Sequence, residues 1–358
     1  LLIKAKKPFI WAGGGVLMSG ASKELKELAE LTGIPVFCSM PGKSAFDERH
    51  PLSLGAGCGT TTLPSYQWLK DSDVILVIGS SLTRSPYAQD ISPGKTLLHN
   101  TINPADINKD ESAMVGLIGD TKLTLIEMIE ECKKQGFKRK DYETDQIKKK
   151  INLLKKEWME KWDPILNSDE DPLNYYRIIN EIYKNIEPEN SIVTHDAGAP
   201  RDCMVPFYKA TIPNSYIGWG KTTHLGFGIP LMIGAKMAHP EKFCLNLMGD
   251  GAFGMSGLDL ETAVRAELPI TTVLLNNGAM ATYEGTNIIG PVSQKEYGVS
   301  YMKGNYATIA KGMGAEGLRV EKPHELKKAL KDAQQLNKDG KTVLIDVIAN
   351  IEGRRSKF

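Results

Sequence analysis

Two polar turns that follow apolar runs hold the side chains best suited to chemistry. Asp250 stands between two glycines in MGDGAFG, directly after the run CLNLM, and Asn276 and Asn277 follow the run ITTVLL. The 24 residues between Gly251 and Asn276 hold one predicted helix and one predicted strand. Such a crossover returns the chain to a parallel strand of the same sheet, so both turns are expected at the carboxyl edge, where open α/β sheets bind ligands.

The residue types at this edge predict a cation site. A carboxylate, an amide oxygen and a nearby backbone carbonyl are hard oxygen ligands that suit Mg²⁺ or Ca²⁺, and Mg²⁺ usually shares its sphere with phosphate oxygens. Glycines at 249, 251 and 254 allow backbone N–H groups to approach a phosphate closely. We therefore predict that Asp250 holds a metal ion and that the metal ion holds a diphosphate.

The bulk composition excludes several other function classes. The chain has 358 residues, enough for two domains, and its 44 basic and 43 acidic residues leave a net charge of +1. A net charge so close to zero provides no positive electrostatic field that would attract nucleic acid or an anionic membrane. No apolar run approaches the roughly 18–20 residues of a membrane span. The five cysteines show no C-x-x-C spacing, which favours buried thiols in a reducing, cytoplasmic compartment over zinc or disulfide sites.

The elements that must position these residues alternate between strand and helix. The first unit has predicted strands at 8–12, 34–40, 73–81 and 95–102, with a helix over 22–33. The second has predicted strands at 190–198, 244–251, 270–278 and 341–349, with a helix over 258–268. This alternation predicts an α/β fold with two doubly wound parallel sheets. We expect domains at 1–135 and 173–358, joined by a helical linker over 136–172 whose apolar stripe includes Ile151 and Trp158.

GDG, a gap of 24 residues and NN together resemble the thiamine diphosphate motif of the acetolactate synthase and 2-oxoacid decarboxylase superfamily. The resemblance covers essentially the whole chain. It implies a central Rossmann-like domain followed by a thiamine diphosphate-binding domain. It also implies that Asp250, Asn277 and the backbone carbonyl of Ala279 bind Mg²⁺, while Asn276 has the more structural role.

A second segment, THLGFGIPLMIGA (223–235), is similar to the family segment that closes over the aminopyrimidine ring. The resemblance implies that Leu225 wedges between the two cofactor rings and forces a bent conformation, although a plain core leucine is the alternative. It implies that the Thr223 carbonyl accepts the pyrimidine amino proton. His224 is either a catalytic proton-transfer group beside the cofactor or a structural histidine.

A third segment, THDAG (194–198), aligns with the family loop that contacts the diphosphate. Many relatives carry Gln and His after that glycine, whereas this chain has Ala199 and Pro200, which leaves backbone donors at 198 and 199. The cofactor contacts implied by the resemblance are those of Gly198, Ala199, Thr223, Leu225, Gly249, Asp250, Gly251, Ala252, Asn277, Ala279 and Met280.

Two further segments have less specific patterns. Met280, Thr282, Tyr283 and Glu284 should begin the wall of the active site, and Glu284 is either a catalytic proton-transfer group or an exposed acid at a helix start. The tail GRRSKF is expected to be a frayed basic terminus rather than a cover over the site.

The first unit resembles the family's central domain, which binds FAD in acetolactate synthases and ADP in oxalyl-CoA decarboxylase and is empty in several decarboxylases. GGG at 13–15 matches a flavin-contacting turn, but an ordinary strand–helix turn has the same pattern. The stretches GSSLTRSPYA (79–88) and GAGCGTTT (55–62) depart from the flavin enzymes. They argue against a full flavin site and leave a different nucleotide, or none, open.

The resemblance implies an enzyme that attacks a 2-oxo acid, releases CO2 and passes the carbanion to a proton or a second carbonyl. Two alternatives stay open: a 2-hydroxyacyl-CoA or oxalyl-CoA type lyase, and a non-catalytic cofactor-binding subunit. The family's pyrimidine-binding domain, with its cofactor-protonating glutamate, has no counterpart before Leu1. We therefore expect a homo-oligomer, another chain or a removed segment to complete the site.

Overall fold

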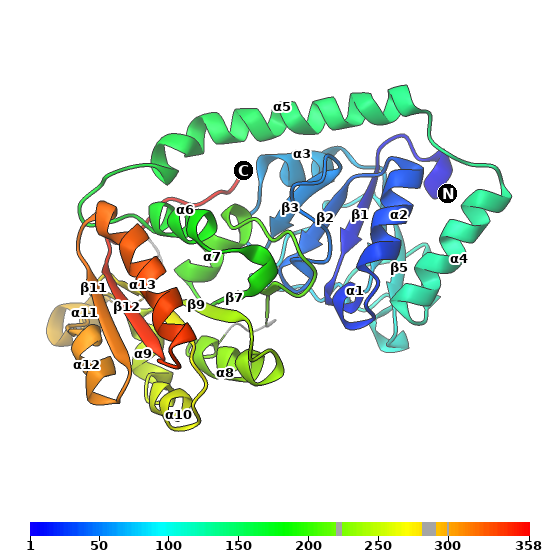
Figure 1. Cartoon of the computed structure of the whole chain (residues 1–358). Helices are drawn as coiled ribbons and strands as arrows, with labels where there is room; N and C mark the ends of the chain where they lie inside the picture. The colour runs from blue at the N-terminus through cyan, green and yellow to red at the C-terminus, as the bar shows by residue number, and fades with distance from the viewer. Residues whose placement is uncertain (220–223, 281–290, 299–300) are drawn as a thin grey trace. The chain divides into compact units, whose positions relative to one another are not determined.

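The computed structural model describes residues 1–219, 224–280, 291–298 and 301–358. The chain forms two compact units (Figure 1). The first comprises Leu1–Trp162, Lys209–Thr222 and Ser356–Phe358, and the second comprises Asp163–Tyr208 and Thr223–Arg355. Each is described separately below.

The first unit is built on a parallel sheet with the order β3-β2-β1-β4-β5-β6. Its strands are β1 (Pro8–Ala12), β2 (Val36–Ser39), β3 (Ser53–Gly57), β4 (Val74–Ile78), β5 (Thr96–Thr101) and β6 (Val115–Ile118). Its helices are α1 (Gly14–Met18), α2 (Ser22–Thr32), α3 (Leu63–Asp71), α4 (Thr121–Lys134) and most of α5 (Asp141–Leu166). Two-residue strand β8 (Tyr216–Ile217) also lies in this unit.

The predicted helix over 22–33 is confirmed as α2, and its sequence explains its limits. Leu25, Leu28 and Ala29 are buried on one face, as their spacing predicts. Gly33 ends the helix in the left-handed conformation, with φ of 63°, which glycine adopts without steric strain.

Helix α5 contributes to the core of the first unit. The core cluster contains Phe9, Trp11 and Phe37 from the sheet together with Ile151 of α5, while Leu154 is partly buried against the cluster. The apolar stripe predicted for the segment is therefore a packed face.

The second unit contains a parallel sheet with the order β11-β12-β10-β9-β7. Its strands are β7 (Ser191–His195), β9 (Phe243–Gly249), β10 (Thr271–Asn276), β11 (Glu316–Val320) and β12 (Val343–Ile348). Its helices are α6 (Tyr175–Asn185), α7 (Ala199–Phe207), α8 (Gly228–Ala238), α9 (Asp250–Ser256), α10 (Asp259–Arg265), α11 (Pro291–Tyr297), α12 (Tyr306–Gly312) and α13 (Leu326–Lys338). The two parallel sheets confirm the predicted α/β class.

The predicted crossover between the two polar turns is confirmed. Strands β9 and β10 are parallel neighbours, with Gly249 opposite Leu275. The connection holds α9 as well as the predicted helix, now α10, because the chain turns helical directly at Asp250. Short 3₁₀ turns elsewhere lie at Leu2–Lys4, Met40–Gly42, Pro104–Asp106, Pro188–Asn190 and Pro323–Glu325.

The expectation of a frayed C-terminal tail is wrong for the part that packs on the second unit. Glu352 is 1% exposed, and Tyr176 Oη donates to the Arg354 carbonyl at 2.6 Å. The Arg354 guanidinium donates to both carboxylate oxygens of Glu170 at 2.8 Å. A bidentate pair of this kind, together with the buried acid, gives the basic tail specific partners that composition does not reveal.

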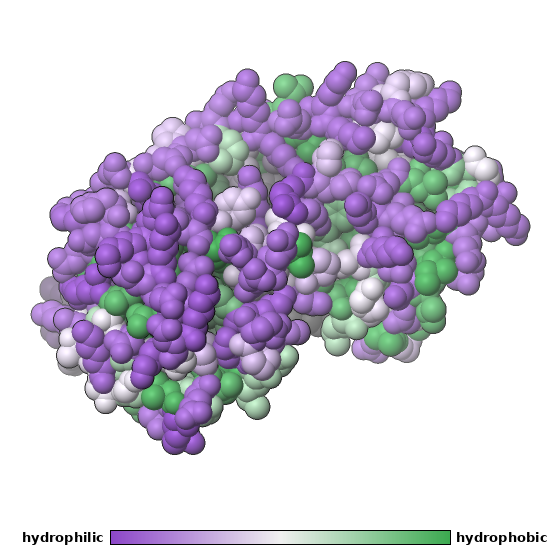
Figure 2. Space-filling model, in the orientation of Figure 1, coloured by the Kyte–Doolittle hydropathy of each residue, from purple (hydrophilic) through white to green (hydrophobic). Residues whose placement is uncertain are grey.

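Helix α13 shows how a helix of the second unit divides between a polar and an apolar face. In Figure 2 the visible side of α13 is hydrophilic, while its Leu326 and Leu330 are buried. Across the described residues we find no helix with the length and apolar character needed to cross a membrane.

Candidate functional site

Three loops of the second unit leave the same edge of its sheet. Strands β7, β9 and β10 are consecutive neighbours and parallel, with His195 opposite Leu247 and Gly249 opposite Leu275. Because parallel strands end at the same edge, the loops that follow them begin side by side. Asp196 and Asn277 lie in the segments that follow β7 and β10, and Asp250 begins α9 directly after β9.

Asp250 joins two of these loops. Its side chain is 2% exposed; Oδ1 accepts a hydrogen bond from Gly251 N at 2.8 Å, and Oδ2 accepts one from Gly278 N at 2.9 Å. Burial raises the pKa of this carboxyl to about 6, although the backbone donors act in the opposite direction. Within the described chain no Lys, Arg or His forms an ion pair with Asp250. A bound cation would supply the missing countercharge.

The two asparagines at the end of β10, Asn276 within the strand and Asn277 directly after it, have different partners. Asn277 Nδ2 donates to the hydroxyl of Tyr175, and Asn277 Oδ1 accepts from Ala279 N at 2.9 Å. Asn276 Nδ2 instead donates to Asp346 Oδ1 at 2.9 Å, and Asp346 is fully buried. Asn276 thus stabilises the fold, while Asn277 Oδ1 retains a second lone pair for a ligand.

The residues at this edge fit a cation that holds a diphosphate. Among the described residues, no atom lies within 4 Å of a β-carbon built on Gly198 or Gly249, so this part of the chain leaves space beside both backbones. Gly251 is more enclosed, since a β-carbon there would lie 3.2 Å from Met280 Cγ. No group of three His, Cys, Asp or Glu side chains suited to a metal occurs among the described residues. A cation here would therefore need amide and carbonyl oxygens in addition to Asp250.

Asp196, which the sequence analysis did not single out, holds the turn that contains Leu225. Its fully buried carboxylate accepts from Gly226 N at 3.0 Å through Oδ1 and from Gly228 N at 2.9 Å through Oδ2. Burial raises its pKa, and these backbone donors partly offset the effect. An available signal was its position, because Asp196, like Asp250, directly follows a buried strand, and a glycine comes two residues after it, at Gly198.

The same turn packs on α9, the helix that begins at Asp250. Gly226 has φ of 89°, and a β-carbon on it would lie 3.0 Å from Ser256 Oγ. Leu225 is half-buried, and the exposed His224 packs its ring edge-on against Phe227 with centroids 4.9 Å apart. The structure thus brings the Leu225 turn and the Asp250 helix into one neighbourhood.

The remaining predicted site residues are partly placed. Ala199 begins α7 and is buried, and Ala252 lies in α9 with 1% exposure. Thr223 and Glu284 lie outside the described residues, as do Thr282 and Tyr283.

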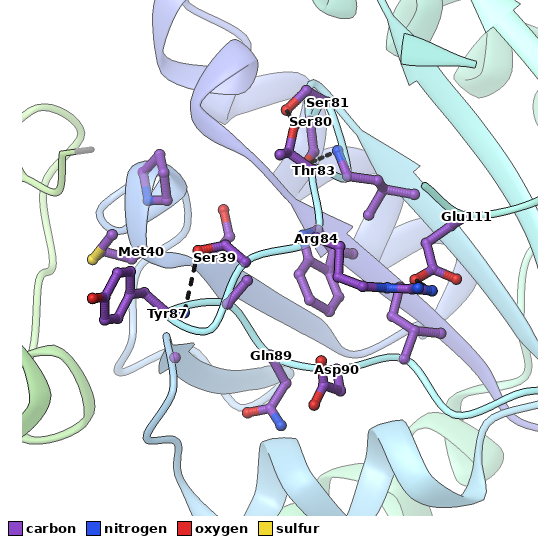
Figure 3. A pocket seen from close by; sticks show the side chains of 17 residues that line it. Ser39, Met40, Ser80, Ser81, Thr83, Arg84, Tyr87, Gln89, Asp90 and Glu111 are labelled. Atoms are coloured by element: carbon purple, nitrogen blue, oxygen red, sulfur yellow. Dashed lines mark hydrogen bonds and ion pairs between the residues drawn. The ribbon is translucent and has the colours of Figure 1, made fainter. Parts of the chain in front are cut away.

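A separate cavity of about 100 Å³ lies in the first unit (Figure 3). It is bordered by the end of β2, by the loop that follows β4 and by Glu111, which comes after β5. The lining residues labelled in Figure 3 are Ser39, Met40, Ser80, Ser81, Thr83, Arg84, Tyr87, Gln89, Asp90 and Glu111. Arg84 Nη2 lies 2.8 Å from Glu111 Oε1, so this guanidinium is already paired.

This cavity is smaller than the pockets that usually hold ligands of nucleotide size. Ligand pockets for molecules of this size usually measure about 300–1,000 Å³. A β-carbon on Gly13 would lie 2.3 Å from the Gly79 carbonyl oxygen, so the GGG turn packs directly against the end of β4. The close approach of Gly13 and Gly15 to Gly79 is a packing reason for these two glycines that requires no ligand.

Two family models match most of the chain. Residues 196–347 match the C-terminal TPP binding domain of thiamine pyrophosphate enzymes, and residues 1–128 match the central domain of the same enzymes; thiamine pyrophosphate is another name for thiamine diphosphate.

Curated relatives agree with these matches. The chain is 32% identical over 347 residues to "Probable acetolactate synthase large subunit" of Methanococcus aeolicus, covering 93% of this chain and 57% of that protein. It is 28% identical over 354 residues to "Acetolactate synthase isozyme 3 large subunit" of Escherichia coli, covering 97% of this chain and 60% of that protein. It is 28% identical over 361 residues to "Acetolactate synthase large subunit" of Corynebacterium glutamicum, covering 97% and 55%.

The chain therefore spans 55–60% of the length of these relatives. Both polar turns and the Leu225 turn lie inside the matched region 196–347. The residues that line the cavity of the first unit lie inside the matched region 1–128. The two regions are separate domains of one kind of enzyme and together account for most of the sequence. The chain belongs to the thiamine pyrophosphate enzymes, of which it carries the central domain and the C-terminal thiamine pyrophosphate-binding domain.

Proposed function

We propose that this protein uses thiamine diphosphate and Mg²⁺ to break and form C–C bonds of a 2-oxo acid, in a reaction of the acetolactate synthase type. The observation that carries the proposal is Asp250. It is a buried carboxylate without a cationic partner in the described chain, and it joins the loops after β9 and β10 inside the matched cofactor domain. The names of the relatives support the choice of reaction type.

Asp250, Asn277 Oδ1 and the Ala279 carbonyl would hold Mg²⁺, and Mg²⁺ would neutralise the diphosphate. The open backbone at Gly198 and Gly249 would accommodate the phosphate oxygens. When bound, thiamine diphosphate supplies the carbon nucleophile for the 2-oxo carbonyl and the ring that accepts the electron pair left by CO2.

The turn after Thr223 would set the shape of the cofactor site. Leu225 would pack between the two rings, and its half-buried side chain leaves part of the residue available for contact. His224 is exposed at the same turn and is our candidate for moving a proton at the substrate. Catalysis would also require the residues that the longer relatives have outside the matched length.

Calorimetric titration of thiamine diphosphate in the presence of Mg²⁺ tests the proposal. We expect binding to the unaltered chain that is lost when EDTA removes the metal. Asp250→Ala should abolish this binding, because no other carboxylate of the described chain faces the same two backbone donors.

Asp259→Ala is the matched control, since Asp259 lies in the same crossover at the start of α10 and should leave affinity unchanged. Asp250→Asn separates charge from folding, because it preserves side-chain volume; it should also weaken binding strongly. Unchanged affinity in either Asp250 variant, with an intact thermal unfolding transition, would refute the metal assignment.

A further inference from the structure

The carboxylate of Asp196 receives three backbone hydrogen bonds from two separate segments. Besides Gly226 N and Gly228 N, the N–H of Ala197 donates to Oδ1 at 2.7 Å. The residue is fully buried, and its own backbone N–H donates to the Leu247 carbonyl at 2.7 Å, which anchors it to strand β9. A buried carboxylate is costly unless it is well hydrogen-bonded, so the loops around it are held to this arrangement.

These bonds determine the geometry on both sides of Leu225 and Phe227. Because a peptide group is planar, directing Gly226 N–H toward Asp196 also sets the direction of the Leu225 carbonyl in the same peptide. Gly228 N–H sets the peptide after Phe227 in the same way. The carboxylate therefore fixes where Leu225 leaves the turn.

Packing restricts the turn independently of these hydrogen bonds. A β-carbon on Gly228 would lie 2.2 Å from Asn246 Oδ1, so the backbone there is pressed against β9. On the other side, Gly226 faces Ser256 of α9. The turn thus has one well-defined shape, with Asp196 supplying its polar contacts.

We propose that Asp196 is a positioning residue, which holds the turn 225–228 in the shape that lets Leu225 bend the bound cofactor. The part of this inference that concerns the cofactor rests on the proposed function. The part that concerns the turn rests only on the hydrogen bonds and can be tested without cofactor.

The first measurement is amide hydrogen exchange in the cofactor-free chain. Asp196→Asn keeps the side-chain volume but turns one acceptor into a donor that faces a backbone N–H. We expect exchange at Gly226 and Gly228 to become at least tenfold faster. Unchanged exchange at both amides would overturn the proposal.

Asp73→Asn is the matched control. Asp73 also accepts three backbone hydrogen bonds, from Lys6 N, Lys7 N and Val74 N at 2.8–3.0 Å, but it lies in the first unit. This variant should speed exchange around its own donors and leave Gly226 and Gly228 as in the unaltered chain. Faster exchange at Gly226 and Gly228 in this control as well would show a general loosening and would also overturn the assignment.

The second measurement is the induced circular dichroism of thiamine diphosphate bound with Mg²⁺. An achiral cofactor gains such a signal when the protein holds its rings in one twisted arrangement. At saturating cofactor, we expect Asp196→Asn to lose at least half of the signal, with the Mg²⁺ dependence of binding preserved because Asp250 and Asn277 are untouched. A signal equal to that of the unaltered chain would overturn the positioning role.

Two outcomes keep the tests separable. Failure of the unaltered chain to bind thiamine diphosphate would contradict the proposed function, while the exchange result would still decide whether Asp196 holds the turn. If Asp196→Asn does not fold, Gly226→Ala distorts the turn from the side of Ser256 and should cause the same loss of signal. An unaltered signal in that variant would overturn the inference.

Discussion

Replacing Tyr175 by phenylalanine should weaken the binding of Mg²⁺ without touching a metal ligand. Tyr175 is the first residue of α6 and is 2% exposed, and its hydroxyl accepts the hydrogen bond from Asn277 Nδ2. Because Asn277 Nδ2 donates to the Tyr175 hydroxyl, Asn277 Oδ1 points away from Tyr175 and accepts a hydrogen bond from Ala279 N. Loss of the hydroxyl frees the amide to rotate.

The magnitude follows from the contact that is lost. Leaving a buried donor unpaired costs about 1–3 kcal/mol, and Asn277 is half-buried, so the lower part of this range applies. Loss of the bond removes this energy from the Asn277 orientation that directs Oδ1 to the metal, and about 1.4 kcal/mol in favour of the other orientations corresponds to a roughly 10-fold loss of affinity. Removal of outer-shell partners of metal ligands generally costs about 10–100-fold, which agrees with this value.

Calorimetric titration of Mg²⁺ at saturating thiamine diphosphate measures the effect. Tyr176→Phe is the control, because the neighbouring hydroxyl lies in the same helix but donates to the Arg354 carbonyl instead. In an Asn277→Ala background, Tyr175→Phe should add little further loss if the coupling passes through Asn277. Equal loss in the two tyrosine variants, or none in Tyr175→Phe, would refute the reasoning.

Two predictions concern the stability of the first unit. Gly13→Ala should lower the free energy of unfolding by about 1–3 kcal/mol in urea titrations, because its β-carbon would lie 2.3 Å from the Gly79 carbonyl oxygen. Gly234→Ala is the control and should not destabilise, because its β-carbon would lie more than 4 Å from every atom of the described residues. Burial lowers the pKa of Lys155 from 10.5 to about 8, so between these values the unfolded state binds more protons and stability rises with pH. Lys155→Met should therefore be more stable than the unaltered protein at pH 7, by up to about 3 kcal/mol, with the difference closing by pH 10; a constant difference in urea titrations at both pH values would contradict the assignment.

The elements that local patterns could predict share one property, which is a continuous apolar run or a clear helical period. Strands β1, β4, β9 and β10 are of this kind, as is α2. Strands β3 and β6 were not predicted, because SLGAG and VGLI lack such a run and owe their strand structure to neighbours that pair with them. Helix α9 was missed because GDGAFGMS has the glycines of a turn.

For the candidate site, spacing was enough to predict that Asp250 and the asparagines at the end of β10 lie at one sheet edge. The contact between Asp250 Oδ2 and Gly278 N agrees with that expectation. The partners of Asn277 and of Asp196 could not be predicted, since Tyr175 is 102 positions from Asn277 and Gly226 is 30 from Asp196. Separations of this size are closed by packing and leave no local pattern.

The sequence alone was sufficient for the α/β class, for the parallel crossover and for the chemical types of the residues at its ends. These features depend on short-range periodicity and on the rule that crossovers join parallel neighbours. The tertiary structure decided which hydrogen bonds the oxygen atoms of Asn277 and Asp250 make, which segments the buried carboxylates join, and that the GGG turn packs against the end of β4. Those outcomes depend on close approach between segments far apart in the chain, and only the packed fold brings such segments together.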